Sequence, residues 1–160
     1  MFEWIAGTTA GKFITTLLIS MLPIVELRLG LPYGIALGLD YPLALTAAVI
    51  GNMIPVPFII IFIQRVFAWL RKHYPKLDNW ISRLENKAHL KGKKVQKYGP
   101  VALLLFVGIP LPGTGAWTGS LIAALLELKP RSAIPCIFIG VLLAAAIMTA
   151  VTFGVIHVVS

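Results

Sequence analysis

Apolar residues fill the chain in long stretches, and two of these stretches carry proline, glycine or charged residues at their centres. The first, LISMLPIVELRLGLPYGIALG, holds Glu26 and Arg28 between Pro23 and Pro32. The second, LLLFVGIPLPGTGAWTGSLIAALL, is interrupted by PLPGTG. Proline lacks a backbone donor and clashes with the preceding turn, so neither stretch can be one straight helix. Each is predicted to turn back at its centre, where protein or a water-filled cavity must surround the opened backbone.

The pattern predicts one all-α integral membrane domain over residues 1–160. A helix rises about 1.5 Å per residue, so the longest apolar segments can cross a bilayer core of about 30 Å while the arms of the broken segments cannot. Whether residues 3–22 span the membrane or form half of a hairpin stays open. We expect an N-terminal helix and first re-entrant hairpin over 3–39, a transmembrane helix over 42–73, a basic amphipathic helix over 76–97, a second re-entrant hairpin over 100–128 and a transmembrane helix over 131–159.

The two halves show weak internal similarity. Both contain a broken hairpin followed by a long span, and a hairpin does not cross the membrane whereas a span does. The halves are therefore predicted to form an inverted-topology repeat. A shift of 89 positions aligns Leu22-Pro23 with Leu111-Pro112, Gly30 with Gly119, and Ile50-Gly51 with Ile139-Gly140.

Composition supports the membrane assignment and indicates an orientation. The chain is 58% hydrophobic and only 12% charged, which excludes an ordinary soluble domain. Its net charge is +8, but ten of the fourteen Lys and Arg residues lie between Arg65 and Lys97, so we expect no nucleic-acid partner. Such a cluster indicates the cytoplasmic side of the cytoplasmic membrane. Segment 76–97 is predicted to lie on that surface against anionic headgroups. Its apolar face comprises Leu77, Trp80, Ile81, Leu84 and Ala88.

Glu26 and Arg28 are the ionisable residues of the first break. Their spacing of two places them on no common helical face, so extended backbone is expected there. A mutually neutralising pair would fix the turn, because buried charges are usually paired. Alternatively, Arg28 holds a phosphate through its planar fork while Glu26 releases it or relays protons. Charge within a membrane is costly, which favours the functional alternative.

The second break offers hydroxyl groups and opened backbone amides. Helix N-termini at such a break can bind an anion, and its glycines permit close packing. Asn52, within the first long span, is expected to bond an opened hairpin carbonyl or to contact substrate. The candidate substrate-binding residues of both breaks and the span are Pro23, Glu26, Arg28, Gly30, Pro32, Asn52, Pro110, Pro112, Gly113, Thr114, Gly115, Trp117, Thr118 and Ser120.

Enzyme signatures are missing from the sequence. It contains no phosphate loop, serine elbow or HExxH motif. The three histidines have no metal-ligand spacing, and Cys136 is the only cysteine. We expect no catalytic activity, no metal and no cofactor.

The strings VELRLGLPYG and GIPLPGTGAWTGSL resemble the small multi-drug export protein family, over nearly the whole chain. That family looks like a compact relative of the DedA superfamily, which is built on two opposed re-entrant hairpins. The resemblance implies movement of phospholipids or polyprenyl phosphates, with acids in the first hairpin and arginines in the second. Glu26 would match the acid. No arginine lies between Pro110 and Leu126, so Arg28 would have to bind the phosphate.

The leading functional prediction is a transporter for an amphiphile with an anionic headgroup, a lipid or polyprenyl phosphate, with optional proton coupling. The alternatives are proton-coupled export of small cationic drugs and a non-transporting scaffold bound to anionic lipids. Because so small a chain encloses little interior, a homodimer through the Gly- and Ala-rich last span is expected. The substrate and the coupling ion stay open.

Overall fold

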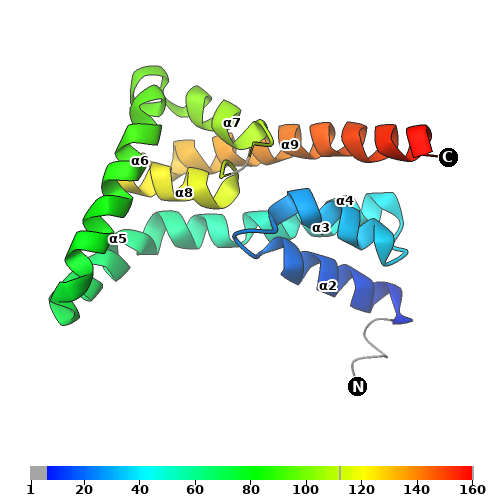
Figure 1. The fold of residues 1–160 in the computed structure, drawn as a ribbon, viewed down its shortest axis with the longest axis horizontal. Coiled ribbons are helices and arrows are strands. Elements are labelled where there is room, and N and C mark those ends of the chain that lie inside the picture. Colours follow the sequence, from blue (N-terminus) through cyan, green and yellow to red (C-terminus); the bar gives the residue numbers. More distant parts are fainter. Residues whose placement is uncertain (1–6, 112, 160) are drawn as a thin grey trace.

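The computed structural model describes residues 7–111 and 113–159, and these ranges contain helices and no strand (Figure 1). The expected all-α class is therefore confirmed. The helices are α2 (Thr9–Ser20), α3 (Glu26–Ala36), α4 (Tyr41–Met53), α5 (Pro55–His73), α6 (Asp78–Tyr98), α7 (Pro100–Gly108), α8 (Ala116–Leu125) and α9 (Pro130–Val159), with a short 3-10 turn, η1 (Pro75–Leu77).

Two long rods form the axis of the molecule. Helices α4 and α5 continue one another across Ile54, which keeps helical angles of φ −56° and ψ −47°. Segments Tyr41–His73 and Pro130–Gly154 are long and apolar enough to cross a membrane, with mean hydropathies of 2.2 and 2.5. Figure 1 shows α9 running in the opposite direction to α4 and α5. The two long apolar segments expected from the sequence are therefore present as candidate membrane spans.

Two pairs of short helices pack on these rods. Helices α2 and α3 pack on α4, whereas α7 packs on α9 and α8 packs on α5 and α9. The pairs come from opposite ends of the molecule, and their turns meet in the middle (Figure 1). Helix α2 is about 18 Å long and α7 about 14 Å, so none of these arms can cross a bilayer alone.

Glycine allows the short helices to approach the rods closely. A Cβ on Gly51 of α4 would stand 2.2 Å from the carbonyl oxygen of Leu17 in α2. A Cβ on Gly140 of α9 would stand 2.7 Å from the carbonyl oxygen of Leu104 in α7. Each helix pair therefore packs closely on its rod at a glycine of that rod.

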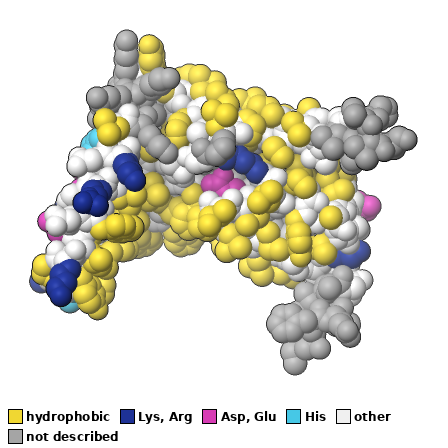
Figure 2. Space-filling view, in the orientation of Figure 1, with side chains coloured by type: hydrophobic (Ala, Val, Ile, Leu, Met, Phe, Trp, Pro, Cys, Tyr) yellow, Lys and Arg dark blue, Asp and Glu magenta, His cyan; other side chains and the backbone are white. Residues whose placement is uncertain are grey.

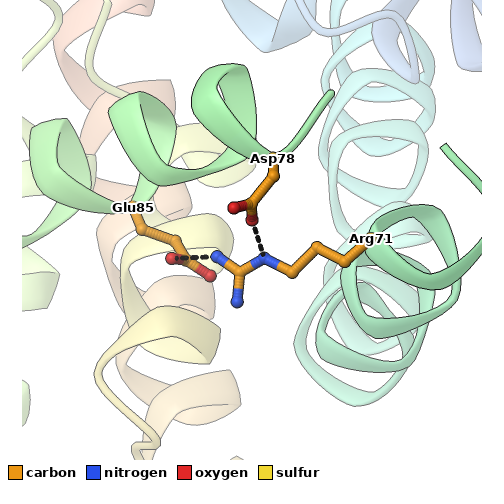
Figure 3. Close-up of polar contacts among 3 residues, drawn as sticks. All are labelled: Arg71, Asp78 and Glu85. Atoms are coloured by element: carbon orange, nitrogen blue, oxygen red, sulfur yellow. Dashed lines mark hydrogen bonds and ion pairs between the residues drawn. The ribbon is translucent and has the colours of Figure 1, made fainter. Parts of the chain in front are cut away.

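Helix α6 lies across one end of the bundle, and an arginine joins it to α5 (Figures 1 and 3). Arg71 Nε lies 3.0 Å from Asp78 Oδ1, and its Nη2 lies 2.6 Å from Glu85 Oε2. Within the expected apolar face, Ile81 is fully buried whereas Trp80 is exposed. Part of that face thus packs against the protein.

Small residues of α9 are used within the chain. Gly140 lies against α7, and Ala144 and Ala145 are buried. The expected homodimer would associate through these small residues of the last span. Because they already pack within the chain, that face is largely occupied. The homodimer stays a prediction.

Replacing Gly140 by alanine should destabilise the protein by about 1–3 kcal/mol, because the new methyl group meets a backbone carbonyl that cannot rotate away. Gly154 is the matched control on the same helix, since a Cβ there meets nothing within 4 Å. Gly154→Ala should be neutral or stabilise by up to about 1 kcal/mol through helix propensity. Thermal unfolding in detergent measures both, and equal effects of the two changes would contradict the packing assignment.

Candidate functional site

Glu26 connects the first helix pair to the second. Its backbone has φ 47°, an unusual left-handed conformation for a residue other than glycine, and it begins α3. The residue is only 5% exposed, and its Oε1 accepts a hydrogen bond from the backbone N–H of Trp117 at 3.2 Å. The first N–H groups of a helix have no partner within the helix, and carboxylates are favoured there. Glu26 therefore caps α8 from the other helix pair.

Gly115 makes room for this cap. It precedes α8 with φ 145°, a region that only glycine adopts readily, and has no side chain to cap the helix itself. A Cβ at this position would stand 2.0 Å from Glu26 Oε2. The glycine and the carboxylate thus occupy complementary space.

Arg28 of α3 donates hydrogen bonds to the turn after α7, in the other helix pair. Its Nη1 donates to the carbonyl oxygen of Leu111 at 2.7 Å, and its Nη2 donates to Thr114 Oγ1 at 2.8 Å. Nη2 also lies 3.5 Å from the carbonyl oxygen of Ile109. The Thr114 hydroxyl lies 2.8 Å from that same carbonyl and 3.2 Å from the Leu111 N–H. Arg28 and Thr114 together organise the turn after α7, where prolines have removed backbone donors.

Trp117 adds a third bond between the pairs. Its indole Nε1 donates to the carbonyl oxygen of Met21, the residue that ends α2, at 2.9 Å. The last carbonyls of a helix also lack intrahelical partners. Hence the end of α2, the start of α8 and the turn after α7 each have a hydrogen-bond partner across the junction.

A cavity of about 470 Å³ opens at this junction, within the size range of small-molecule sites. Figure 2 shows an acidic and a basic patch side by side there, at the centre of a largely hydrophobic face. The cavity is lined by Pro23, Ile24, Glu26, Arg28, Leu29, Pro110, Leu111, Gly113, Thr114 and Thr118.

Seven of the fourteen sequence-predicted residues line this cavity, namely Pro23, Glu26, Arg28, Pro110, Gly113, Thr114 and Thr118. Gly115 and Trp117 lie in the junction beside it. Asn52 lies behind it, in a smaller cavity shared with Glu26. Pro112 lies outside the described residues.

Three predicted residues lie away from this cavity. Gly30 packs on Ser20, where a Cβ would stand 1.9 Å from the hydroxyl oxygen. Pro32 lines a separate apolar surface hollow. Ser120 is buried and donates to the Ala116 carbonyl within α8. Their contacts are those of packing positions.

One expectation about the charged pair, that of extended backbone, is wrong. The backbone from Glu26 through Arg28 is helical rather than extended, and only Glu26 departs from right-handed geometry. Within the described ranges no ion pair joins the two side chains. Each charge instead bonds the other helix pair, because that turn presents free backbone groups.

The apolar part of the cavity wall was not predicted from the sequence. Ile24 is 90% exposed, and Leu29 and Leu111 are also exposed beside the cavity. Hydrophobic residues in an apolar chain give no sequence signal that separates a cavity wall from lipid-facing surface.

A second cavity, of about 310 Å³, lies between α5, α6 and α8, and was also not predicted. Its polar lining residues are Gln64, Arg71, Glu85, His89 and Glu127. Gln64 donates to the Ala124 carbonyl at 2.6 Å and so satisfies the end of α8. Within the described residues, no group of acidic, histidine and cysteine side chains is arranged to hold a metal ion.

The antiparallel apolar rods, long enough to cross a membrane, define a helical membrane protein. The profile of the family described as "Putative small multi-drug export protein" matches residues 26–147. This range covers more than half of the 160 residues, so the chain belongs to that family. Comparison with curated proteins and with solved structures gives no match. The family description is that of an export protein and names no reaction.

Gly115→Ala should displace the Glu26 carboxylate and strain the backbone, destabilising the protein by about 2–4 kcal/mol. Gly99 is the matched control, because its φ of 64° is also positive but a Cβ there meets nothing within 4 Å. Gly99→Ala should cost only the backbone strain of that region, about 1–3 kcal/mol. Thermal unfolding of both variants is the measurement, and an equal loss would mean that the contact with Glu26 contributes nothing.

Proposed function

We propose that this protein is a membrane transporter that moves an amphiphile with an anionic headgroup, of the lipid phosphate class, through the cavity at the junction. The observation that supports this proposal is that the Glu26 and Arg28 side chains differ in burial and in their hydrogen-bond partners. Both side chains line the cavity, but Glu26 is buried against the start of α8 whereas Arg28 is only partly buried. The charge offered to a substrate is therefore positive.

Arg28 retains donors for a headgroup. A guanidinium has five N–H groups. Its bonds to described residues use one hydrogen of Nη1 and those of Nη2, which leaves Nε–H and the second Nη1 hydrogen. These two donors lie on different edges of the guanidinium, so bidentate binding of a phosphate requires that Nη2 release one of its present bonds. The hydroxyls of Thr114 and Thr118 line the same cavity.

The exposed apolar residues at the cavity suit the rest of an amphiphile. Ile24, Leu29 and Leu111 are exposed on the surface that a membrane-embedded chain presents to lipid. A substrate could keep its tail among these side chains while its headgroup reaches Arg28. Such lateral access needs no wide aqueous channel, which a chain of 160 residues could hardly enclose.

We further propose that the two helix pairs are re-entrant hairpins of an inverted repeat. The 89-residue shift carries the start of α3 at Glu26 to 115, next to the start of α8 at Ala116. It also pairs Gly51 with Gly140, which make equivalent close contacts. The exposed basic residues of α6 support placing that end in the cytoplasm, beside anionic headgroups of the cytoplasmic membrane.

Export of small cationic drugs is the second candidate function. The family description favours it. A cation would have to draw the Glu26 carboxylate away from the Trp117 N–H while Arg28 lines the same cavity. Removing Arg28 should therefore assist a cationic substrate and impair an anionic one.

Arg28→Gln keeps amide donors for the Leu111 carbonyl and removes the charge. We expect it to reduce transbilayer movement of a fluorescent lipid phosphate in proteoliposomes by about 10- to 100-fold, the usual strength of charged hydrogen bonds. Arg65→Gln, on α5 beside Phe62, is the matched control and should transport normally. If Arg28→Gln instead speeds uptake of a cationic dye and leaves lipid movement unchanged, the second candidate function is correct.

Glu26 is our candidate for proton coupling. Protonation would remove the negative charge that caps α8, and so would loosen the junction. Glu26→Gln keeps one carbonyl acceptor but cannot change charge. Transport by this variant should no longer respond to an imposed pH gradient, whereas wild-type transport should. A gradient response that survives in Glu26→Gln would exclude Glu26 as the coupling group.

A further inference from the structure

Asn52 presents a buried acceptor with no partner. It lies on α4, within a long apolar segment, and is 4% exposed. Its Oδ1 has no hydrogen-bond partner in the described residues. Buried polar atoms are nearly always hydrogen-bonded, and each exception needs a physical reason.

The Asn52 side chain lines a cavity of about 10 Å³. That volume corresponds to about one water molecule. The other polar side chains in its lining are Glu26 and Arg28. Its remaining walls are Leu27, Val107, Gly115, Ala116, Val141 and Ala144, so α7 and α9 contribute only apolar side chains.

We propose that a single water molecule binds in this cavity and donates one hydrogen bond to Asn52 Oδ1 and one to the Glu26 carboxylate. Both protein groups are acceptors, so whatever joins them must carry two donors or a positive charge. A metal cation is disfavoured because the Arg28 guanidinium lines the same cavity and the start of α8 faces the same carboxylate. Water meets the requirement with at least two polar partners.

This water makes Asn52 a positioning residue for Glu26. Helix α4 is part of a long rod, whereas Glu26 lies at the turn between two short helices. The bridge holds the carboxylate in line with the Trp117 N–H. The inference rests on the proposed function only for its consequence in transport, since the hydration itself can be tested without any substrate.

Asn52→Leu removes the acceptor at similar volume, and Thr46→Val, on an exposed part of α4, is the matched control. The measurement is the infrared carboxyl band of Glu26 in purified protein, identified by its loss in Glu26→Gln. We expect Asn52→Leu to shift this band and to lower the unfolding temperature by about 2–4 °C. Asn52→Ser, which keeps an oxygen and leaves space for more water, should return the band toward its wild-type position.

Two results would overturn the proposal. If Asn52→Leu raises the unfolding temperature and leaves the Glu26 band unchanged, the orphan oxygen is an isolated defect without a bound water. If exchanging choline chloride for sodium chloride shifts the wild-type band, a cation occupies the cavity. Failure of the proposed function would differ from both, because wild-type protein would then move no substrate while the infrared shift in Asn52→Leu persisted.

Discussion

Hydrogen bonding across the junction of the two helix pairs is the interaction on which the rest of the structure depends. Each pair is broken at its turn, and a broken turn leaves backbone N–H and C=O groups that lipid cannot satisfy. Glu26 supplies the acceptor for the start of α8, and Arg28 supplies donors for the turn after α7. The indole N–H of Trp117 donates to the carbonyl oxygen of Met21 at the end of α2. Neither helix pair is therefore complete without the other.

The same side chains line the cavity at the junction, so the proposed substrate binding would be coupled to the stability of the junction. A headgroup that bonds Arg28 competes with the Leu111 carbonyl, and a change at Glu26 alters the start of α8. A ligand can shift a conformational equilibrium only through such differences in contact between two states. The junction thus provides both a place for the proposed substrate and a physical reason for the two helix pairs to separate.

The remaining structure holds this junction in place. Gly51 and Gly140 seat the short helices on the rods at distances that no larger residue permits. At one end, Arg71 joins α6 to α5 through Asp78 and Glu85, outside the apolar part of the bundle. Mobility required for transport is consequently expected at the polar junction rather than along the glycine contacts, where backbone meets backbone.

The sequence by itself determined the helical membrane class, the two long apolar segments and the two breaks. Those features follow from local rules, because apolar runs need lipid or protein around them and proline cannot continue a helix. Seven predicted site residues line the cavity because the breaks are also where the chain exposes polar groups.

Only the tertiary structure decided what those polar groups bond. The separation between Glu26 and Trp117 is 91 positions, and that between Arg28 and Leu111 is 83. The usual pairing of buried charges left open that Glu26 and Arg28 neutralise each other, but each forms its hydrogen bonds with the turn of the opposite helix pair. Likewise, the sequence did not show why position 115 needs glycine. In the structure, the Glu26 carboxylate occupies the space where a side chain at this position would lie.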